Sequence, residues 1–110
     1  MNNRVSLLGT VVGAPVYHCT TDARDLLRFT LRIADEAGTG EAFNQECIIW
    51  GGPAIGLADC LQSGDRILVR GPLRYRQGRT SGYVHIRRYL LLGGGVARQA
   101  LALADAYEHT

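Results

Sequence analysis

The residues with the clearest chemical potential are arginines concentrated in one stretch of the chain. All 12 lysine-plus-arginine positions are arginine, and seven of them lie between Arg66 and Arg88, where no acidic residue occurs. A local run of positive charge suits the phosphate backbone of a nucleic acid. The formal net charge is only +2, so this prediction depends on how the charge is distributed. A solvated strand face balanced by acids elsewhere is the alternative.

Aromatic side chains lie close to the expected basic surface. Trp50 is the single tryptophan and falls at the end of an apolar strand pattern, while Tyr75 and Tyr83 lie among the arginines. Single-stranded nucleic acids bind to a positive groove that also offers rings, because every base can stack regardless of sequence. The alternatives are a half-buried core position for Trp50 and ordinary strand propensity for the two tyrosines.

Several arginines are expected to share exposed strand faces. Arg74 and Arg76 are two residues apart, so both side chains point to the same side of a strand, and we expect them to contact phosphates. Arg28 and Arg32 lie on the polar face of an earlier strand pattern. Arg79 follows in the same acid-free stretch and is included among the candidate nucleic-acid contacts.

The sequence offers no pattern for catalysis. There is no Ser-His-Asp, metal-binding or phosphate-loop motif, and Asp35 and Glu36 are adjacent in an expected loop, which splays their carboxylates. We therefore expect a binding protein that is not an enzyme and uses no cofactor. A protein–protein adaptor remains an alternative of a different class, because barrels of the type derived below also carry protein partners.

The three cysteines indicate free thiols. Cys19, Cys47 and Cys60 are odd in number and lack metal-binding spacing, and we expect Cys47 and Cys60 in the core. A zinc site at His18 and Cys19 is disfavoured, because adjacent strand residues point in opposite directions. Free thiols, together with the lack of a signal segment or a membrane-length apolar run, predict a reducing cytoplasmic location.

Five strands and a short helix are expected to position these side chains. Alternation of apolar and polar residues, or a run of branched residues, predicts strands at 4–12, 26–34, 46–50, 66–76 and 83–92. Within them we expect a bend at Gly9, a break at 13–15 and a kink at 71–72. The second strand should turn Leu27, Phe29, Leu31 and Ile33 inward, and the last should turn Val84 and Ile86 inward with His85 and Arg87 outward.

Two helices are expected, one inside the strand order and one after it. Pro53 suits the first turn of a helix at 54–61 and Gly64 a stop, with Ile55, Leu57, Ala58 and Leu61 on the buried face. Three glycines at 93–95 precede an Ala/Leu-rich segment, 96–107, that predicts a C-terminal helix packed on the barrel or on a partner subunit. A frayed tail is the alternative for this segment.

The order of these elements predicts the fold. Three strands, a helix and two strands in about 90 residues is the order of an all-β, five-stranded OB-fold barrel, a fold that binds oligonucleotides or oligosaccharides. We expect one domain at 1–92, followed by the glycine hinge and C-terminal segment at 93–110.

Four short motifs occur in a characteristic order: Asn3-Arg4-Val5-Ser6-Leu7-Leu8-Gly9, Phe29-Thr30-Leu31, Cys47-Ile48-Ile49-Trp50-Gly51 and Gly71-Pro72-Leu73-Arg74. Together they resemble the bacterial single-stranded DNA-binding protein family. The resemblance covers most of the chain up to about Leu92. It implies an OB barrel that protects single-stranded DNA in replication, recombination or repair, and a homo-oligomer that is usually a tetramer.

The resemblance also implies roles for individual residues. Arg4, Trp50, Arg74 and Arg76 fall where family members carry a basic residue, a DNA-stacking aromatic and two basic residues. His18 falls where a base-contacting arginine is usual, so a weaker role is implied for it. Replication or repair proteins are possible partners in this family.

The chain departs from the family pattern in its loops and at its C-terminus. Two family tryptophans are absent, their places falling near Ala37 or Asn44 and near Gly78, and the loops at 35–44 and 77–82 are short. Weaker binding or a shorter footprint is implied. The final Glu108-His109-Thr110 does not resemble the acidic tail of the main replicative member. Primosomal replication protein N, a short dimeric relative acting in replication restart, has a similar N-terminal pattern and is the alternative within this class.

Overall fold

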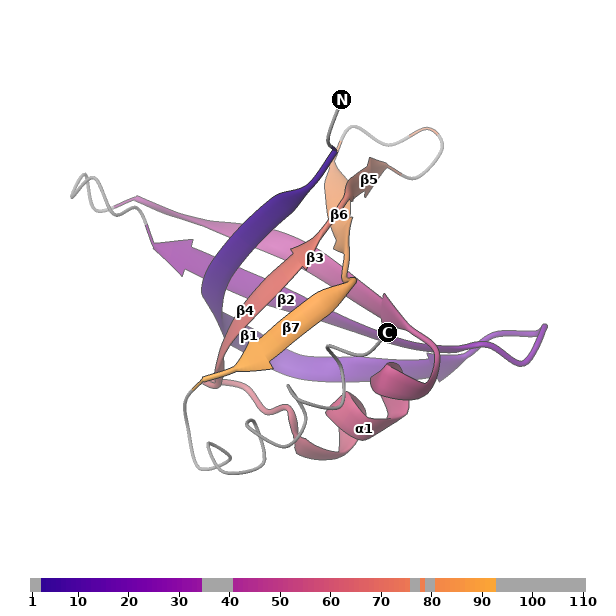
Figure 1. Cartoon of the computed structure of the whole chain (residues 1–110). Coiled ribbons are helices and arrows are strands. Elements are labelled where there is room, and N and C mark those ends of the chain that lie inside the picture. Colours follow the sequence, from indigo (N-terminus) through magenta and orange to yellow (C-terminus); the bar gives the residue numbers. More distant parts are fainter. Residues whose placement is uncertain (1–2, 35–40, 76–77, 79–80, 93–110) are drawn as a thin grey trace.

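The computed structural model describes residues 3–34, 41–75, 78 and 81–92, which form one curled β-sheet with a helix at one end (Figure 1). The segment predicted as a C-terminal helix, the domain boundary at 93, and the candidate residues Arg76 and Arg79 lie outside the described residues. The described elements are β1 (Val5–Cys19), β2 (Asp25–Ala34), β3 (Ala42–Trp50), α1 (Gly52–Cys60), β4 (Arg66–Gly71), β5 (Leu73–Tyr75), β6 (Gly82–His85) and β7 (Arg88–Leu91).

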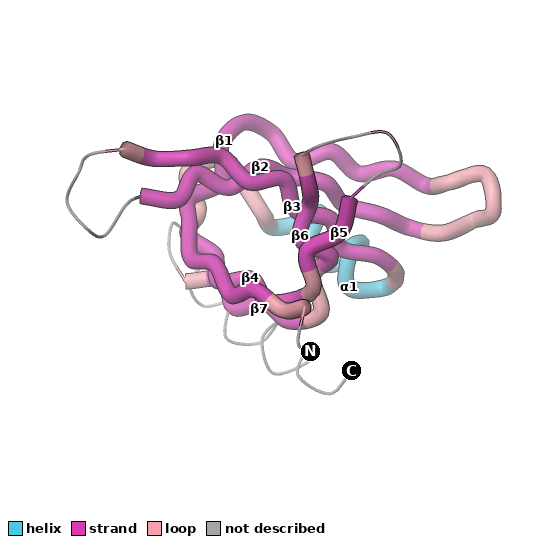
Figure 2. The backbone as a smooth tube through the Cα atoms, turned by 90° about the horizontal axis from the view of Figure 1, so that it is seen from above, coloured by secondary structure: helices cyan, strands magenta, loops and turns pink. Residues whose placement is uncertain are grey.

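The strands form one sheet in the order β5-β6-β3-β2-β1-β4-β7. β3 and β6 are parallel, and every other neighbouring pair is antiparallel. Seen from above, the strands curl around a central space, which the core side chains fill (Figure 2). The expectation of a five-stranded barrel is wrong in detail: the sheet has seven strands, and among the described residues no ladder joins β5 to β7 to close it.

Seven strands arise because two expected strands change partners part-way along. The expected 66–76 strand divides at Pro72 into β4, which pairs with β1 and β7, and β5, which pairs with β6. The expected 83–92 strand divides at Ile86 and Arg87. Here the Ile86 amide donates to the Ile48 carbonyl over 2.9 Å, and the Arg87 amide donates to the Arg70 carbonyl over 2.8 Å. At this point the chain stops pairing with β3 and begins to pair with β4.

Gly71 is required at this junction. A Cβ atom there would lie 1.9 Å from the carbonyl oxygen of His85, and such an overlap with backbone forces the chain to shift. Pro72 follows it, and its carbonyl accepts a hydrogen bond from the His85 amide over 2.9 Å. The predicted kink at 71–72 is therefore confirmed, and it brings β5 alongside β6.

The first strand is longer than its sequence pattern indicated. The expected break at 13–15 is wrong, because β1 continues to Cys19 and absorbs this segment as an irregularity in its pairing with β2 between Val12 and Val16. The bend expected at Gly9 falls where β1 changes its pairing partner from β4 to β2. Thr10, the next residue, pairs with both Arg32 and Arg66. A Cβ atom on Gly9 would lie 2.7 Å from the Arg32 carbonyl oxygen.

The core lies inside the curl of the sheet and under α1. Its buried residues include those predicted on the inner faces, Leu27, Phe29, Leu31, Val84 and Ile86, with Ile33 partly buried against them. Pro53 occupies the first turn of α1 as predicted, and Leu57 and Leu61 face the core. Ile55 does not: it is 46% exposed, so its predicted burial is wrong. The helix is only nine residues long, and its buried stripe is correspondingly narrow. Among the described residues, no helix combines the length and apolar character needed to span a membrane.

Candidate nucleic-acid interface

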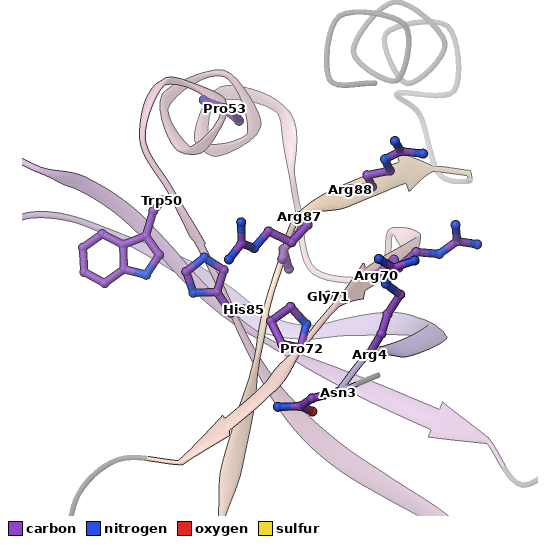
Figure 3. Close-up of a pocket in the computed structure, with 11 residues that line it drawn as sticks. Asn3, Arg4, Trp50, Pro53, Arg70, Gly71, Pro72, His85, Arg87 and Arg88 are labelled. Carbon is purple, nitrogen blue, oxygen red and sulfur yellow. The ribbon is translucent and has the colours of Figure 1, made fainter. Parts of the chain in front are cut away.

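An open groove of about 690 Å³ lies on the outside of the sheet (Figure 3). Residues distant in sequence meet there, because the groove is bordered by residues 3–4, the end of β3, the start of α1, the end of β4 and the β6–β7 junction. The groove is lined by Asn3, Arg4, Trp50, Pro53, Arg70, Gly71, Pro72, His85, Ile86, Arg87 and Arg88. It therefore combines four arginines, a histidine and the single tryptophan, without a carboxylate.

The arginines of the groove are placed by strand pairing. Arg70 on β4 pairs directly with Arg88 on β7, and like charges opposite each other destabilise a sheet. The Arg70 Nε donates to the Ser6 hydroxyl over 3.1 Å, which leaves its charge uncompensated. Asn3 fixes the chain beside Arg4, because its side-chain amide makes two hydrogen bonds with the backbone of Leu73, of 2.9 and 3.2 Å. An anion in the groove would relieve the repulsion between these guanidinium groups.

Trp50 lies at the edge of the groove, outside the buried core cluster. It ends β3, where it pairs with Leu26, and its side chain is partly buried. Gly51 turns the chain away immediately afterwards with φ 87°, a conformation that favours glycine. The guanidinium carbon of Arg24 lies 4.4 Å from the centroid of the indole ring, within the range of a cation–π contact.

His85 lies in the groove between the aromatic edge and the arginines. It is on the outward face of β6, opposite Ile48 of β3. Partial burial, and then the charges of Arg87, Arg74 and Arg24, lower the pKa of His85 below its ordinary value of 6.5. The imidazole is therefore neutral at neutral pH, in a site where cations predominate.

The other predicted residues on the described strands lie on the outer face of the same sheet, with one exception. Tyr75 alternates with Arg74 on β5 and shares the face of Leu73, which packs against the core, so it points to the opposite side from Arg74. Because Leu27, Phe29 and Cys47 point inward, their strand neighbours point outward. His18 and Arg28 meet at a hollow of about 240 Å³. Tyr83 lines a separate polar hollow of about 590 Å³ together with Glu46. The remaining two candidates on β5 and the one on β2 are exposed: Arg74, Tyr75 and Arg32.

The structure thus brings Arg4 and Trp50 together in the groove, and His18 and Arg28 together beside it. Sequence reasoning did not select Arg24, Arg70, His85, Arg87 or Arg88 as binding residues. The sequence did contain a signal for Arg70, His85, Arg87 and Arg88, because all four lie in the acid-free stretch between Arg66 and Arg88. The predicted outward orientation of His85 and Arg87 is confirmed. Arg24 gave no signal, because its position over Trp50 depends on how two strands pair.

The cysteines agree with the expectation of free thiols. Cys47 is buried, Cys60 is partly buried and Cys19 is exposed, and all three are free. Burial first, and then the charge of Glu46, raise the pKa of Cys47 to about 12, so its thiol stays protonated. Among the described residues, no three metal-ligating side chains are grouped as a metal site would require.

A curled β-sheet with one helix between β3 and β4, and a basic, aromatic-edged groove on its outer face, defines an OB-fold binding protein. The model of the single-strand binding protein family matches residues 2–91, and the chain belongs to this family. A crystal structure of the SSB domain of a Synechococcus sp. protein is similar, with a TM-score of 0.69 at 20% sequence identity, over 81% of this chain and 94% of that one. At this identity the likeness concerns the fold alone. No curated protein matches the chain in sequence.

Proposed function

We propose that this protein binds single-stranded DNA without sequence preference, through contacts between arginines and phosphates and through stacking of a base on Trp50. The observation that carries the proposal is the groove itself, where Arg4, Arg70, Arg87 and Arg88 surround a path that leads to the indole and no carboxylate lines it. Membership in the single-strand binding protein family supports the same ligand.

The chemistry of the groove favours a single strand over a duplex. Its arginines exchange condensed counterions for phosphates, a gain that does not depend on sequence. Stacking on an aromatic ring needs an unpaired base with a free face, and it contributes about 1–3 kcal/mol per base. Arg28, Arg32, Arg74 and Tyr83 extend the proposed path across the outer face, and His18 lies beside Arg28. Tyr75, Arg76 and Arg79 remain proposed DNA contacts from the sequence. The role is non-catalytic protection of DNA in replication, recombination or repair in the cytoplasm.

A homo-oligomer is part of the proposal, with a tetramer favoured over a dimer. The outer face of β1, β4 and β7 supports it, because Leu8, Leu68 and Leu90 form one cross-strand row there and Leu8 is 39% exposed. The mass of the full chain in solution tests this point. A dimer would favour a replication-restart role like that of primosomal replication protein N.

Fluorescence anisotropy of a labelled thymidine oligomer, measured over a range of salt concentrations, tests the proposed function. We expect saturable binding that weakens as salt rises, strong quenching of Trp50 emission, and much weaker binding to a duplex of the same length. The lack of any salt-dependent binding to the oligomer would contradict the proposal and favour the protein–protein adaptor. Saturable binding with constant Trp50 emission would retain DNA binding and remove the indole from the path.

A further inference from the structure

His85 lies in the groove beside Arg87, and the charges of two further arginines, Arg74 and Arg24, also act on it. Arg24 comes from the turn between β1 and β2, Arg74 from β5, and Arg87 from the junction between β6 and β7. The Arg87 side chain points toward His85, and both line the groove with Trp50 (Figure 3). Arg74 pairs with Tyr83, which precedes His85 by two residues on the same face of β6.

Arg24 is held in place by its own turn. The Thr20 amide donates to the Arg24 carbonyl over 2.8 Å, and the Arg24 amide donates to the Thr20 hydroxyl over 3.1 Å. The Gly51 amide donates to the Asp25 carbonyl over 2.8 Å, which ties the start of β2 to the end of β3. The guanidinium of Arg24 is thereby kept against the Trp50 ring, on the side of the sheet where His85 lies.

The remaining charged and titratable groups on this face are few. Arg28 lies opposite Ile48 on the next strand, and its Nε is 3.8 Å from a carboxylate oxygen of Glu46. Tyr83 is the neighbouring titratable group on β6 itself. No described carboxylate forms an ion pair with Arg24, Arg74 or Arg87. Asp22 is the acidic group of the turn that carries Arg24: its hydrogen bond with Thr20 and, to a lesser extent, the charge of Arg24 lower the pKa of its carboxyl. Arg24 is therefore compensated in part by Asp22, whereas among the described residues no such carboxylate accompanies Arg74 or Arg87.

We propose that Arg24, Arg74 and Arg87 together bind one DNA phosphate next to the base on Trp50, and that His85 takes up a proton from solvent when this phosphate binds. The inference rests on the proposed function and adds to it a specific phosphate subsite. A phosphodiester brings a negative charge into a cluster of cations, and it offers oxygens to which an imidazolium can donate. Both effects favour the protonated form of His85 in the complex, which is disfavoured in the free protein.

The sign of the pH dependence follows from this proton uptake. The free protein holds His85 neutral over a range of pH in which the complex holds it protonated, because cations and burial lower its pKa before DNA binds. The complex therefore carries more protons in that range, and affinity for DNA increases as pH falls through it. One linked proton gives at most a tenfold change in affinity per pH unit.

The experiment is a binding titration of a labelled thymidine oligomer at constant ionic strength, at a series of pH values between about 5 and 8. The thymidine oligomer has no group that titrates in this range. We expect the affinity of the unchanged protein to increase several-fold as pH falls. We expect His85→Gln to remove most of that slope, while Arg24→Gln weakens binding and reduces the slope in part.

Two further measurements distinguish proton uptake by His85 from uptake by another group. The chain contains three histidines, so a variant with His18→Gln and His109→Gln should keep the pH slope, whatever its affinity at any single pH. Calorimetry in buffers of different ionisation enthalpy counts the protons taken up by the unchanged protein, and this readout does not require any variant to fold. Proton uptake of zero, or an unaltered slope in a folded His85→Gln protein, overturns the inference. Binding that is tight but independent of pH would leave the proposed function standing, whereas no binding at any pH would remove both.

Discussion

The groove at Trp50 and the outer face of β2 both present arginines on the same sheet, but their surroundings differ. In the groove, Arg70 lies opposite Arg88, and the cations of that site lack a carboxylate partner among the lining residues. On β2, Arg28 lies 3.8 Å from Glu46. The side chains of that pair are 47% and 32% exposed, so the interaction is weak in free-energy terms, yet it reduces the positive potential offered to DNA.

The difference shows what decides whether an arginine is available for phosphate binding. Strand alternation places an arginine on the outer face, but its directly opposite or diagonal neighbour on the adjacent strand decides whether its charge is repelled or compensated. Arg70 and Arg28 have similar local sequence context as outward strand residues. They differ because β4 pairs with another arginine-bearing strand, whereas β2 pairs with the strand that carries Glu46. Four predictions, each with its control variants, test this comparison.

The largest expected effect comes from the junction that forms the floor of the groove. Gly71→Ala would place a Cβ atom 1.9 Å from the His85 carbonyl oxygen, and backbone cannot rotate out of the way as a side chain can. We expect a loss in the free energy of unfolding at or above the upper end of the roughly 1–3 kcal/mol typical of overpacking. Chemical denaturation measures this loss, and DNA binding should weaken because β5 and the β6–β7 junction are displaced.

Gly52→Ala is the matched control, since a Cβ atom there meets nothing within 4 Å. It should leave the stability unchanged or slightly increased, because alanine is favoured over glycine in a helix. Equal losses in the two variants would show that the close approach at Gly71 is not what holds the groove together.

The second effect is the loss of the stacking ring. Trp50→Ala should weaken binding of a thymidine oligomer by roughly ten- to a hundredfold per engaged site, as removal of one stacked base contact costs about 1–3 kcal/mol. Tyr83→Ala, beside Glu46 in the neighbouring hollow, should cost less. Because Trp50 lies outside the buried core cluster, its removal should destabilise the fold less than Ile49→Ala, for which a core truncation predicts about 2–5 kcal/mol.

Anisotropy titrations and thermal melts of these variants separate binding from folding. If Trp50→Ala lost as much stability as Ile49→Ala and bound DNA normally once folded, the indole would be a core residue. A larger loss of affinity for Tyr83→Ala than for Trp50→Ala would reverse the ranking of the two regions.

Part of this architecture follows from the sequence, because it depends on near neighbours along the chain. Alternation in 26–34 correctly predicted that Leu27, Phe29 and Leu31 face inward, and Pro53 correctly marked the start of the helix. The outward orientation of His85 was predicted in the same way. Each of these features is determined by a local period or by the restricted backbone of one residue.

The remaining features depend on contacts between residues far apart in the chain. The Gly71-Pro72 pair correctly predicted a kink, but no local pattern predicted that the chain changes its partner strand there, nor that the last strand divides at Ile86. The segment at 13–15 carries glycine and proline, as a break would, yet pairing with β2 accommodates it inside β1. Arg24 lies over Trp50 because β2 and β3 pair with Leu26 opposite Trp50, and a shift in register would separate them.

The third effect compares the two groups of arginines directly. Each phosphate contact to a single strand contributes about 0.7 to the slope of log affinity against log salt. Replacement of Arg70 and Arg87 by alanine should therefore reduce the magnitude of this slope by about 1.4, so that binding depends less on salt. Replacement of Arg28 and Arg32 should lower it by less, because Glu46 already compensates part of the charge of Arg28.

Arg66→Ala serves as the control for loss of positive charge alone. Arg66 is exposed on β4 and does not line the groove, so its removal should leave the slope almost unchanged. Equal slopes for the two double variants would mean that pairing with Glu46 does not limit Arg28, and the distinction between the regions would fail.

The smallest effect comes from removing the charge of Glu46, and it is the one change expected to increase the affinity for DNA. Glu46→Gln keeps the shape of the side chain and removes its charge, so Arg28 gains positive potential on the face that carries the proposed DNA path. We expect affinity to increase by about two- to fivefold at low salt, since one exposed charge acting near the ligand contributes at most about 1 kcal/mol. The free energy of unfolding should change by less than about 1 kcal/mol.

Asp59→Asn, an equal change of charge at an exposed position of α1, controls for the general effect of net charge and should increase affinity less. Anisotropy titrations at two salt concentrations measure the difference, which should shrink as screening increases. Weaker binding by Glu46→Gln would instead show that the carboxylate organises the DNA path, and that compensated arginines contribute through position as much as through charge.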